Sequence, residues 1–187
     1  MDKLAHYAEL LRKWTVRINL IAKSTLDDVE HRHIWDSAQI YTGFEGVSAD
    51  LGSGGGLPGV VIAVLAQGEG RQLDLTLIES DQRKATFLRT CARELDLPIS
   101  VVAKRVEEVA SIGAAMITAR ALADLNLLLG FAHPHLAPHG QCVFMKGAKW
   151  REEIARAQEN WRFSYEATPS KTDAQAAILT IKDIERV

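Results

Sequence analysis

The clearest structural signal in the sequence is Asp50-Leu51-Gly52-Ser53-Gly54-Gly55-Gly56-Leu57-Pro58-Gly59, in which four glycines fall within five consecutive residues. Glycine weakens the interior of a helix or strand, so this density indicates a turn in which backbone approaches a ligand closely. Residues 47–51 predict a short strand before the turn, and residues 57–67 predict a helix after it, with Pro58 in its first turn. Such a turn presents unpaired N–H groups and the positive end of a helix dipole. The stretch therefore predicts a site for a nucleotide-like cofactor.

The spacing of the glycines leaves the identity of the cofactor open. Gly54, Gly56 and Gly59 satisfy the dinucleotide fingerprint Gly-x-Gly-x-x-Gly, but that match is weak by itself. Read from Gly52, the pattern is an acidic residue, Asp50, followed by alternating glycines. A carboxylate at this place repels a pyrophosphate and attracts the ammonium group of S-adenosylmethionine. A glycine-rich turn that binds nothing is the structural alternative.

The composition is that of one soluble globular domain of 187 residues, with 47% apolar and 25% charged residues. The formal net charge is −2, so a nucleic-acid partner needs a local basic face rather than a basic chain. Cys91 and Cys142 are far apart, which disfavours a zinc site and a disulfide framework. The sequence has no apolar signal core and no run of about 18 apolar residues. We expect a cytoplasmic monomer without a membrane segment.

The first 46 residues predict a helical cap ahead of the main domain. Apolar residues recur there at spacings of three and four, and we expect this helix face to pack on the body of the protein rather than in a coiled coil. They are Leu4, Tyr7, Leu11, Trp14, Ile18 and Ile21. Residues 26–44 predict a second helix, with Ser24 or Thr25 as its N-cap. The predicted organisation is a cap over residues 1–46 and a Rossmann-like domain over residues 47–187.

His33, Asp36 and Ser37 on the second predicted helix are the residue types of a hydrolytic triad. Spacings of three and four only make them neighbours on a helix face, and no nucleophile elbow accompanies them, so hydrolysis is disfavoured. Two interpretations stay open. The residues form a hydrogen-bond network that orients the cap, which we favour, or they contact the substrate directly.

From residue 47 onward, strands and helices alternate. Strands are predicted at 47–51, 73–79, 99–103, 116–119, 141–146, 163–167 and 176–181, and helices at 57–67, 81–95, 121–129 and 150–160. The alternation implies a mainly parallel sheet with right-handed crossovers, and two final strands without an intervening helix imply an antiparallel hairpin at one edge. The predicted fold class is α/β, and the hairpin favours a methyltransferase over a dehydrogenase.

Several residues follow predicted strands, at the edge where open α/β sheets bind ligands. Glu79 ends the second strand, where a carboxylate accepts both ribose hydroxyls of an adenosine. Val106-Glu107 follows the third strand, either beside an adenine or as a solvated helix start. Arg120 follows the fourth strand, and this position favours a role in the site over a structural role. Lys146 ends the fifth strand and faces either the substrate or solvent.

Two groups of side chains are less specific. The helix predicted at 81–95 carries cations that form either a solvated face or a strip contacting phosphates. They are Arg83, Lys84, Arg89 and Arg93. A metal site at His133, His135 and His139 is disfavoured, because no carboxylate or cysteine is near and a proline interrupts the segment. We expect no metal.

Taken together, the motifs resemble the RsmG family, formerly GidB, of bacterial 16S rRNA guanine-N7 methyltransferases. The resemblance spans nearly the whole chain, and the combination of motifs is specific although each motif alone is not. In the cap, it rests on Trp14-x-x-x-x-Asn19-Leu20 and Arg32-His33-Ile34-x-Asp36-Ser37. In the main domain, it rests on residues 50–59, Leu77-Ile78-Glu79, Lys84-x-x-Phe87-Leu88, Arg105-Val106-Glu107, Thr118-Ala119-Arg120-Ala121 and Phe144-Met145-Lys146-Gly147.

The resemblance implies a class I S-adenosylmethionine-dependent methyltransferase (Rossmann-like) fold with S-adenosyl-L-methionine as its cofactor. It also implies methylation of N7 of one guanine in 16S rRNA, which we expect within a small-subunit ribosomal particle. Carried over position by position, it places the cofactor at Gly52, Leu57, Val106, Glu107 and Arg120. The positional arguments above add Asp50, Gly54, Gly56 and Glu79 to the cofactor contacts. The expected catalytic residues are Arg120 and Lys146, and the expected substrate contacts are Arg83, Lys84 and Arg89.

The absence of an obvious general base fits this chemistry, because guanine N7 has a free lone pair and carries no proton. Two alternatives remain open at the level of the sequence. One is a nicotinamide-dependent oxidoreductase, and the other is a non-catalytic cofactor-binding module that acts in ribosome assembly.

Overall fold

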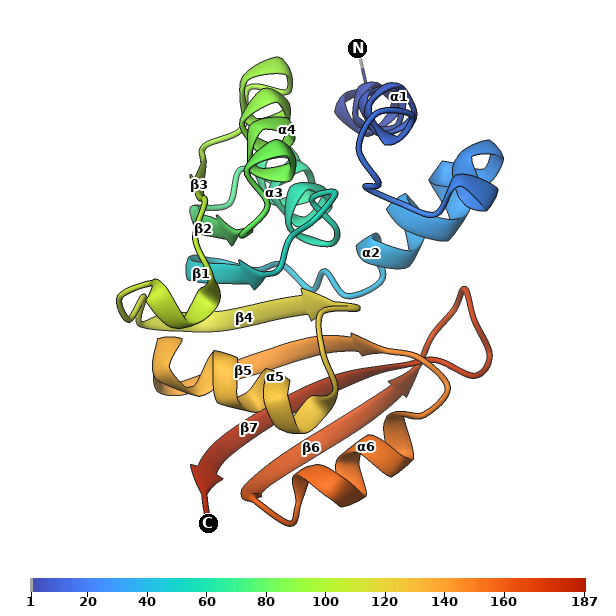
Figure 1. Cartoon of the computed structure of the whole chain (residues 1–187). Coiled ribbons are helices and arrows are strands. Elements are labelled where there is room, and N and C mark those ends of the chain that lie inside the picture. Colours follow the sequence, from blue (N-terminus) through green and yellow to red (C-terminus); the bar gives the residue numbers. More distant parts are fainter. Residues whose placement is uncertain (1) are drawn as a thin grey trace.

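A seven-stranded mixed sheet forms the centre of the computed structural model, which describes residues 2–187 (Figure 1). Its strand order is β3-β2-β1-β4-β5-β7-β6. The strands are β1 Gly46–Leu51, β2 Leu73–Ile78, β3 Ile99–Val102, β4 Ala114–Arg120, β5 Leu136–Lys146, β6 Trp161–Pro169 and β7 Ala177–Arg186. Strands β1 to β5 pair in parallel, whereas β7 is antiparallel to both β5 and β6. The predicted α/β class, with a mainly parallel sheet and a C-terminal antiparallel hairpin, is confirmed.

Helices cover both faces of the sheet. They are α1 Lys3–Thr15, α3 Gly59–Gly68, α4 Gln82–Glu94, α5 Leu125–Ala132 and α6 Trp150–Ala157, with short 3-10 turns at Val106–Glu108 and His133–His135. Alternate residues of β4 serve opposite faces, because Ile117 packs with α5 and α6 whereas Met116 packs with Ile62 of α3. Within residues 2–187, no helix is long and apolar enough to cross a membrane.

Helix α1 packs against the body of the protein, as predicted. Tyr7 and Leu11 are fully buried in a cluster that includes residues of α3, α4 and β2. The predicted length of this helix is wrong, because it ends at Thr15 and the apolar period continues to Ile21. The backbone N–H groups of residues 17 and 18 both bond to the carbonyl of Trp14, at 2.9 Å each, and this turn returns the chain to the sheet. Ile21 is therefore buried from a loop and not from a helix.

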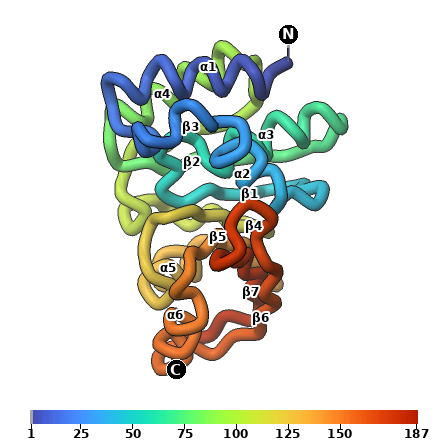
Figure 2. Tube along the Cα trace, turned by 90° about the vertical axis from the view of Figure 1, so that its right-hand side faces the viewer, coloured from blue at the N-terminus to red at the C-terminus, as the bar shows by residue number. Residues whose placement is uncertain are grey.

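The second predicted helix, over residues 26–44, is replaced by three short segments. They are a 3-10 turn Lys23–Asp28, a π-helix Glu30–Trp35 and the single turn α2 Asp36–Ala38. The predicted caps are also wrong, because Ala22 takes the cap position and the Thr25 hydroxyl donates back to the Ala22 carbonyl at 2.7 Å. π-Helical turns are frequent at functional sites. Figure 2 shows the loop between β6 and β7 beside this segment, although the two are far apart in sequence.

The division into a cap, 1–46, and a Rossmann-like domain, 47–187, stays a proposal. The helical residues of the cap share one hydrophobic cluster with α3, α4 and strand β2. The predicted start of the helix at residue 121 is wrong. Helix α5 begins at Leu125, and residues 121–124 form a loop. Asp124 is its N-cap, with Oδ1 accepting from the Leu127 N–H at 3.1 Å.

Candidate functional site

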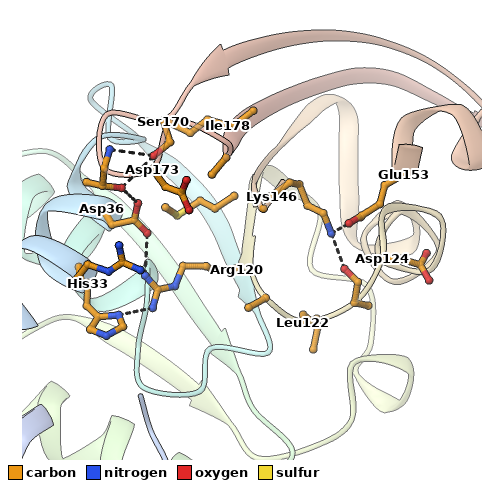
Figure 3. Close-up of a pocket in the computed structure, with 18 of the residues that line it drawn as sticks. His33, Asp36, Arg120, Leu122, Asp124, Lys146, Glu153, Ser170, Asp173 and Ile178 are labelled. Atoms are coloured by element: carbon orange, nitrogen blue, oxygen red, sulfur yellow. Dashed lines mark hydrogen bonds and ion pairs between the residues drawn. The ribbon is translucent and has the colours of Figure 1, made fainter. Parts of the chain in front are cut away.

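Two cavities open at the carboxyl edge of the parallel strands, and they meet at the end of β4. The smaller, of about 370 Å³, lies over β1, β2 and β3, and the larger, of about 560 Å³, lies over β4, β5 and β7. Both are lined by Arg120, Ala121 and Leu122. Open α/β sheets bind ligands at this edge. Figure 3 shows the larger cavity, with Arg120 and Leu122 among the residues that line it.

The glycine turn forms one wall of the smaller cavity. Gly52 and Gly54 have φ values of 61° and 55°, which L side chains rarely adopt. A Cβ atom at Gly52 would lie 2.5 Å from Cδ1 of Leu122, so any larger residue would clash with that side chain. The turn is held from behind by helix α1, since the buried Tyr7 hydroxyl donates to the Gly55 carbonyl. The backbone is therefore both exposed to the cavity and fixed in place.

Glu79 lies in this cavity with its carboxylate aimed at the glycine turn. Oε2 accepts from the Gly54 N–H at 2.8 Å, and Oε1 accepts from the Asp81 N–H at 2.7 Å. The residue is 8% exposed. Two backbone donors thus orient a carboxylate at the end of β2, in the place predicted for a ribose partner.

Of the other predicted cofactor residues, some line the smaller cavity and some do not. Leu57, Val106 and Glu107 line the smaller cavity together with the glycines, so Val106-Glu107 is more than a solvated helix start. Lys84 also lines it, as do Lys104 and Arg105, which the positional arguments did not single out. These last residues follow β3 in a loop, and no periodic pattern marks such positions in a sequence.

Asp50 does not line either cavity, contrary to prediction. It is fully buried beneath the glycine turn, where Oδ1 accepts from the Thr118 hydroxyl at 2.7 Å. Oδ2 has no hydrogen-bond partner in the described part of the chain. Burial raises the pKa of the Asp50 carboxyl to about 6, and the bond from Thr118 opposes that rise. The side chain supports the turn from below. A direct contact with an ammonium group in the cavity does not fit its position.

Gly56 is likewise a structural residue of the turn. It has a φ of 84°, and a Cβ atom there would lie 2.5 Å from Cγ2 of Val60 in helix α3. It does not line the cavity. Its glycine identity follows from the start of the helix and not from contact with a ligand.

Asp50→Asn should change how stability depends on pH. The carboxyl pKa rises from 3.8 to about 6 on folding, so the native state binds more protons than the unfolded state between these values. Stability therefore falls as pH rises through this window, by about 3 kcal/mol in total for a shift of about two pKa units. Asparagine does not titrate, so the variant lacks this loss of stability. The free energy of unfolding of Asp50→Asn minus that of the wild type should therefore rise by up to this amount from pH 4 to pH 7.

Urea titrations at pH 4, 5, 6 and 7 measure the effect. Asp74→Asn, an exposed carboxyl on β2, is the matched control and should run parallel to the wild type. A difference between Asp50→Asn and wild type that is constant with pH would contradict the assignment.

Arg120 is held at the junction of the two cavities by two residues of the cap segment. Nη1 donates to Oδ2 of Asp36 at 3.0 Å, and Nη2 bonds to Nδ1 of His33 at 2.8 Å. The side chains of Arg120 and Asp36 are each 19% exposed. His33 and Asp36 are therefore joined through Arg120 and not by the predicted network on one helix face, and both residues line the larger cavity. Ser37 is buried and its hydroxyl has no hydrogen-bond partner among residues 2–187, so it does not belong to this network.

The bond between His33 and Arg120 requires a neutral imidazole. The Thr25 hydroxyl donates to the Ala22 carbonyl, so it accepts from Nε2–H of His33 at 2.7 Å. This leaves the lone pair on Nδ1 to accept from the guanidinium. Burial, followed by the charge of Arg120, lowers the pKa of His33 to about 4, which is consistent with the neutral form at pH 7.

Lys146 faces the larger cavity, but its ammonium group is already paired. Nζ forms an ion pair with Oε2 of Glu153 at 2.6 Å and donates to the Ala123 carbonyl at 2.7 Å. Glu153 also accepts from the Leu125 N–H at 2.9 Å. Of the two alternatives for Lys146, facing the substrate or facing solvent, the second does not fit, since its side chain is 7% exposed. Figure 3 places this pair on the opposite side of the cavity from Arg120, and the geometry favours a role in fixing the 121–124 loop over a catalytic role.

The cations of α4 do not form one strip. Lys84 points into the smaller cavity, whereas Arg83 is exposed and pairs with Asp81 at 3.2 Å. Arg89 is exposed on the outer side of the helix, one turn before Arg93. Arg93 lines a third cavity, of about 380 Å³, between α1 and α4. Residues at spacing i, i+4 are surface neighbours, so Arg89 and Arg93 lie on the same face of the helix. Arg83 and Lys84 are not part of that face.

His133 and His135, two of the three histidines of the disfavoured metal site, have different partners. His133 packs on the Trp161 ring, with ring centroids 5.6 Å apart, and His135 is buried with Nε2 3.3 Å from the Val106 carbonyl. Over the described range, residues 2–187, no group of three or more His, Cys, Asp or Glu side chains is placed to hold a metal ion.

Residues 1–179 match the GidB family, which is described as rRNA small subunit methyltransferase G. A ribosomal RNA small subunit methyltransferase G of Ruegeria sp. (strain TM1040) is 43% identical over 189 residues, covering all of this chain and 92% of that protein. One from Cereibacter sphaeroides (strain ATCC 17025 / ATH 2.4.3) is 49% identical over 191 residues, covering all of this chain and 91% of that protein. A crystal structure of a SAM dependent methyltransferase from Aquifex aeolicus shares the fold, with a TM-score of 0.64 at 11% identity over 85% of this chain and 95% of that chain. The match along nearly the whole sequence places this protein in the GidB family, rRNA small subunit methyltransferase G.

Proposed function

We propose that the protein transfers the methyl group of S-adenosyl-L-methionine to N7 of a guanine in 16S rRNA. The observation that carries the proposal is the pair of cavities joined at Arg120, one lined by the glycine turn and Glu79 and the other open beside it. The smaller cavity fits the cofactor and the larger one fits the target base. The names of the relatives, which are ribosomal RNA small subunit methyltransferases, support the same conclusion.

The residues of the smaller cavity fit S-adenosylmethionine. Glu79 offers a carboxylate oriented by two N–H groups, which suits a ribose diol. Gly52 and Gly54 line this cavity without side chains, so their backbone is accessible to a ligand there. Glu107 and Lys84 supply charges of opposite sign for the ammonium and carboxylate of an amino acid. Because Asp50 is buried, the choice against a dinucleotide rests on the family and not on that carboxylate.

The chemistry needs positioning rather than proton transfer. S-adenosylmethionine supplies an electrophilic methyl group on a sulfonium. Guanine N7 carries a lone pair and no proton, so no side chain has to act as a general base. In the larger cavity, His33 is committed to Arg120 and Lys146 to Glu153, so neither has a free lone pair for that purpose. Arg120 is placed to orient both ligands, and orientation alone accounts for large rate effects.

Calorimetric titration separates this proposal from the oxidoreductase alternative. We expect S-adenosylhomocysteine to bind the protein and NADH not to bind. Binding of NADH alone would contradict the proposal, and binding of S-adenosylhomocysteine without methyl transfer to rRNA would favour the non-catalytic module.

We further propose that the substrate is rRNA within a small-subunit ribosomal particle and that phosphates bind between α1 and α4. The third cavity is lined there by the cations Lys13, Arg17 and Arg93 beside Trp14. Lys13 and Arg17 are exposed, while Arg93 contacts Glu94 at 3.0 Å. A local basic face of this kind compensates for a chain whose formal net charge is −2.

Lys13→Glu combined with Arg17→Glu should lower methylation of rRNA and flatten its dependence on salt. Loss of two phosphate contacts reduces the slope of log affinity against log salt by roughly 1.5. Filter binding of 16S rRNA from 50 to 200 mM salt, with methyl incorporation in parallel, measures both quantities. Arg162→Glu combined with Lys182→Glu is the matched control, since both residues are exposed on the C-terminal hairpin and the change in charge is the same. Equal effects of the two double variants would contradict a local site.

A further inference from the structure

The loop between β6 and β7 is bonded to the residues that hold Arg120. Asp36 accepts from Arg120 through Oδ2, and its other oxygen, Oδ1, accepts from the Thr172 hydroxyl and from Nε2 of Gln39, the latter at 2.9 Å. Gln39 also donates to the Ser170 hydroxyl at 3.1 Å and accepts from the Lys171 N–H at 2.8 Å. Figure 3 shows Ser170 and Asp36 on the same wall of the larger cavity as Arg120.

These bonds satisfy the polar groups of the contact in one consistent way. The Gln39 amide uses both of its N–H groups, toward Asp36 and Ser170, and its oxygen accepts from the backbone of the loop. Within the loop, the Thr172 N–H bonds to the Ser170 hydroxyl at 3.2 Å, and the Ser170 N–H bonds to the Ala176 carbonyl at 3.0 Å. The loop is therefore bonded to itself and to the cap segment, and Ser170 and Thr172 are half-buried where they line the larger cavity.

Three segments far apart in sequence thus join in one network, in which the hairpin loop reaches the Arg120 guanidinium through Asp36. The cap segment supplies Asp36 and His33, strand β4 supplies Arg120, and the hairpin loop supplies Thr172. A carboxylate that pairs with an arginine keeps it in one orientation only if the carboxylate itself is held. Thr172 and Gln39 are the side chains that hold the oxygen of Asp36 which Arg120 leaves free.

We propose that the hairpin loop is a positioning element for methyl transfer, in which Thr172, acting through Asp36, fixes the Arg120 guanidinium between the cofactor and the target base. This rests on the proposed function. Thr172 is a positioning residue and not a catalytic one, because its hydroxyl is bonded to Asp36. Removal of this hydroxyl should therefore lower the rate of methyl transfer more than it changes cofactor affinity or global stability.

Thr172→Val removes the hydroxyl and keeps the shape of the side chain, and Thr172→Ser keeps the hydroxyl. We expect Thr172→Val to lower the single-turnover rate of methyl transfer to small-subunit particles by roughly tenfold, as for a lost hydrogen bond to a charged group. Thr172→Ser should stay within about twofold of the wild type on the same scale. Thr168→Val is the matched control, because Thr168 is exposed on β6 and does not line the cavity. The melting temperatures of Thr172→Val and Thr168→Val should be similar.

A second measurement does not depend on the substrate. Nitrogen-15 NMR of the Arg120 guanidinium reports its rotation, which should be slow in the wild type and in Thr172→Ser and faster in Thr172→Val. An unchanged rotation in Thr172→Val overturns the inference whether or not rRNA is methylated, and so does a serine variant as slow in transfer as the valine variant. If the wild-type protein transfers no methyl group, but the Arg120 guanidinium rotates faster in Thr172→Val than in the wild type, the proposed function is contradicted. The positioning of Arg120 by Thr172 is then still supported.

Discussion

Replacing Arg120 by lysine should reduce methyl transfer by roughly 100-fold while the protein stays folded, because misplacement of about 1 Å at the reacting centre costs this much. The guanidinium reaches Asp36 and His33 with two nitrogens at once, at 3.0 and 2.8 Å. An ammonium group keeps the charge but cannot reproduce this planar fork. Nδ1 of the neutral His33 would then lose its donor, and the side chain would no longer be fixed between the cavities.

Turnover and thermal unfolding have to be measured on the same samples. Arg71→Lys is the control, since Arg71 also forms two ion pairs, with Glu45 and Glu69 at 2.7 Å each, but on the surface away from the cavities. This control should change neither rate nor melting temperature, because surface ion pairs contribute little. An Arg120→Lys protein that melts early but turns over normally when folded would make Arg120 a scaffold residue.

Replacing Glu79 by alanine should weaken the binding of S-adenosylhomocysteine by a factor of about 10 to 100, as expected for loss of about 1.5–3 kcal/mol from a hydrogen bond to a charged group. The carboxylate is held at the end of β2 by the Gly54 and Asp81 N–H groups, at 2.8 and 2.7 Å, and lines the smaller cavity. The alanine variant loses both the ribose partner and the acceptor that orients the glycine turn.

Glutamine at this position separates the two effects. Glu79→Gln keeps one acceptor oxygen but loses the charge, so its affinity should fall between those of alanine and the wild type. Isothermal calorimetry gives the dissociation constants, and circular dichroism checks the fold. A dissociation constant unchanged by Glu79→Ala would remove this residue from the cofactor site.

The main domain could be predicted from sequence because its signals are local. An apolar strand, a glycine turn and an apolar helix follow one another at residues 47–67, and each later strand is bounded by polar or small residues. The alternation of strands and helices then predicts the mainly parallel pairing, and the two final strands predict the hairpin at one edge. Glu79 and Arg120 were placed at the ligand edge by the same reasoning, because the edge is defined by the ends of parallel strands.

The parts that could not be predicted depend on contacts between distant residues. The apolar stripe of the first helix continues past Thr15, and only the packing of the chain on the sheet shows where the helix ends. Asp50 and Lys146 stand at strand ends like Arg120, but one is covered by the glycine turn and the other is paired with Glu153. Periodicity does not report which neighbour a strand-end side chain meets. Nor does it connect Thr172 with Asp36, which are brought together only by the fold.

The most direct test of the account is methyl transfer to RNA of known sequence. Small-subunit particles from cells that lack the modification are incubated with the wild-type protein and radiolabelled S-adenosylmethionine. Naked 16S rRNA is the second arm, and Arg120→Lys, which should transfer roughly 100-fold more slowly, is the comparison variant. Reductive aniline cleavage then maps any N7-methylguanine. We predict close to one methyl group per particle and cleavage at a single guanine of 16S rRNA. No incorporation in either arm, or methyl groups without cleavage at a guanine, would contradict the assignment.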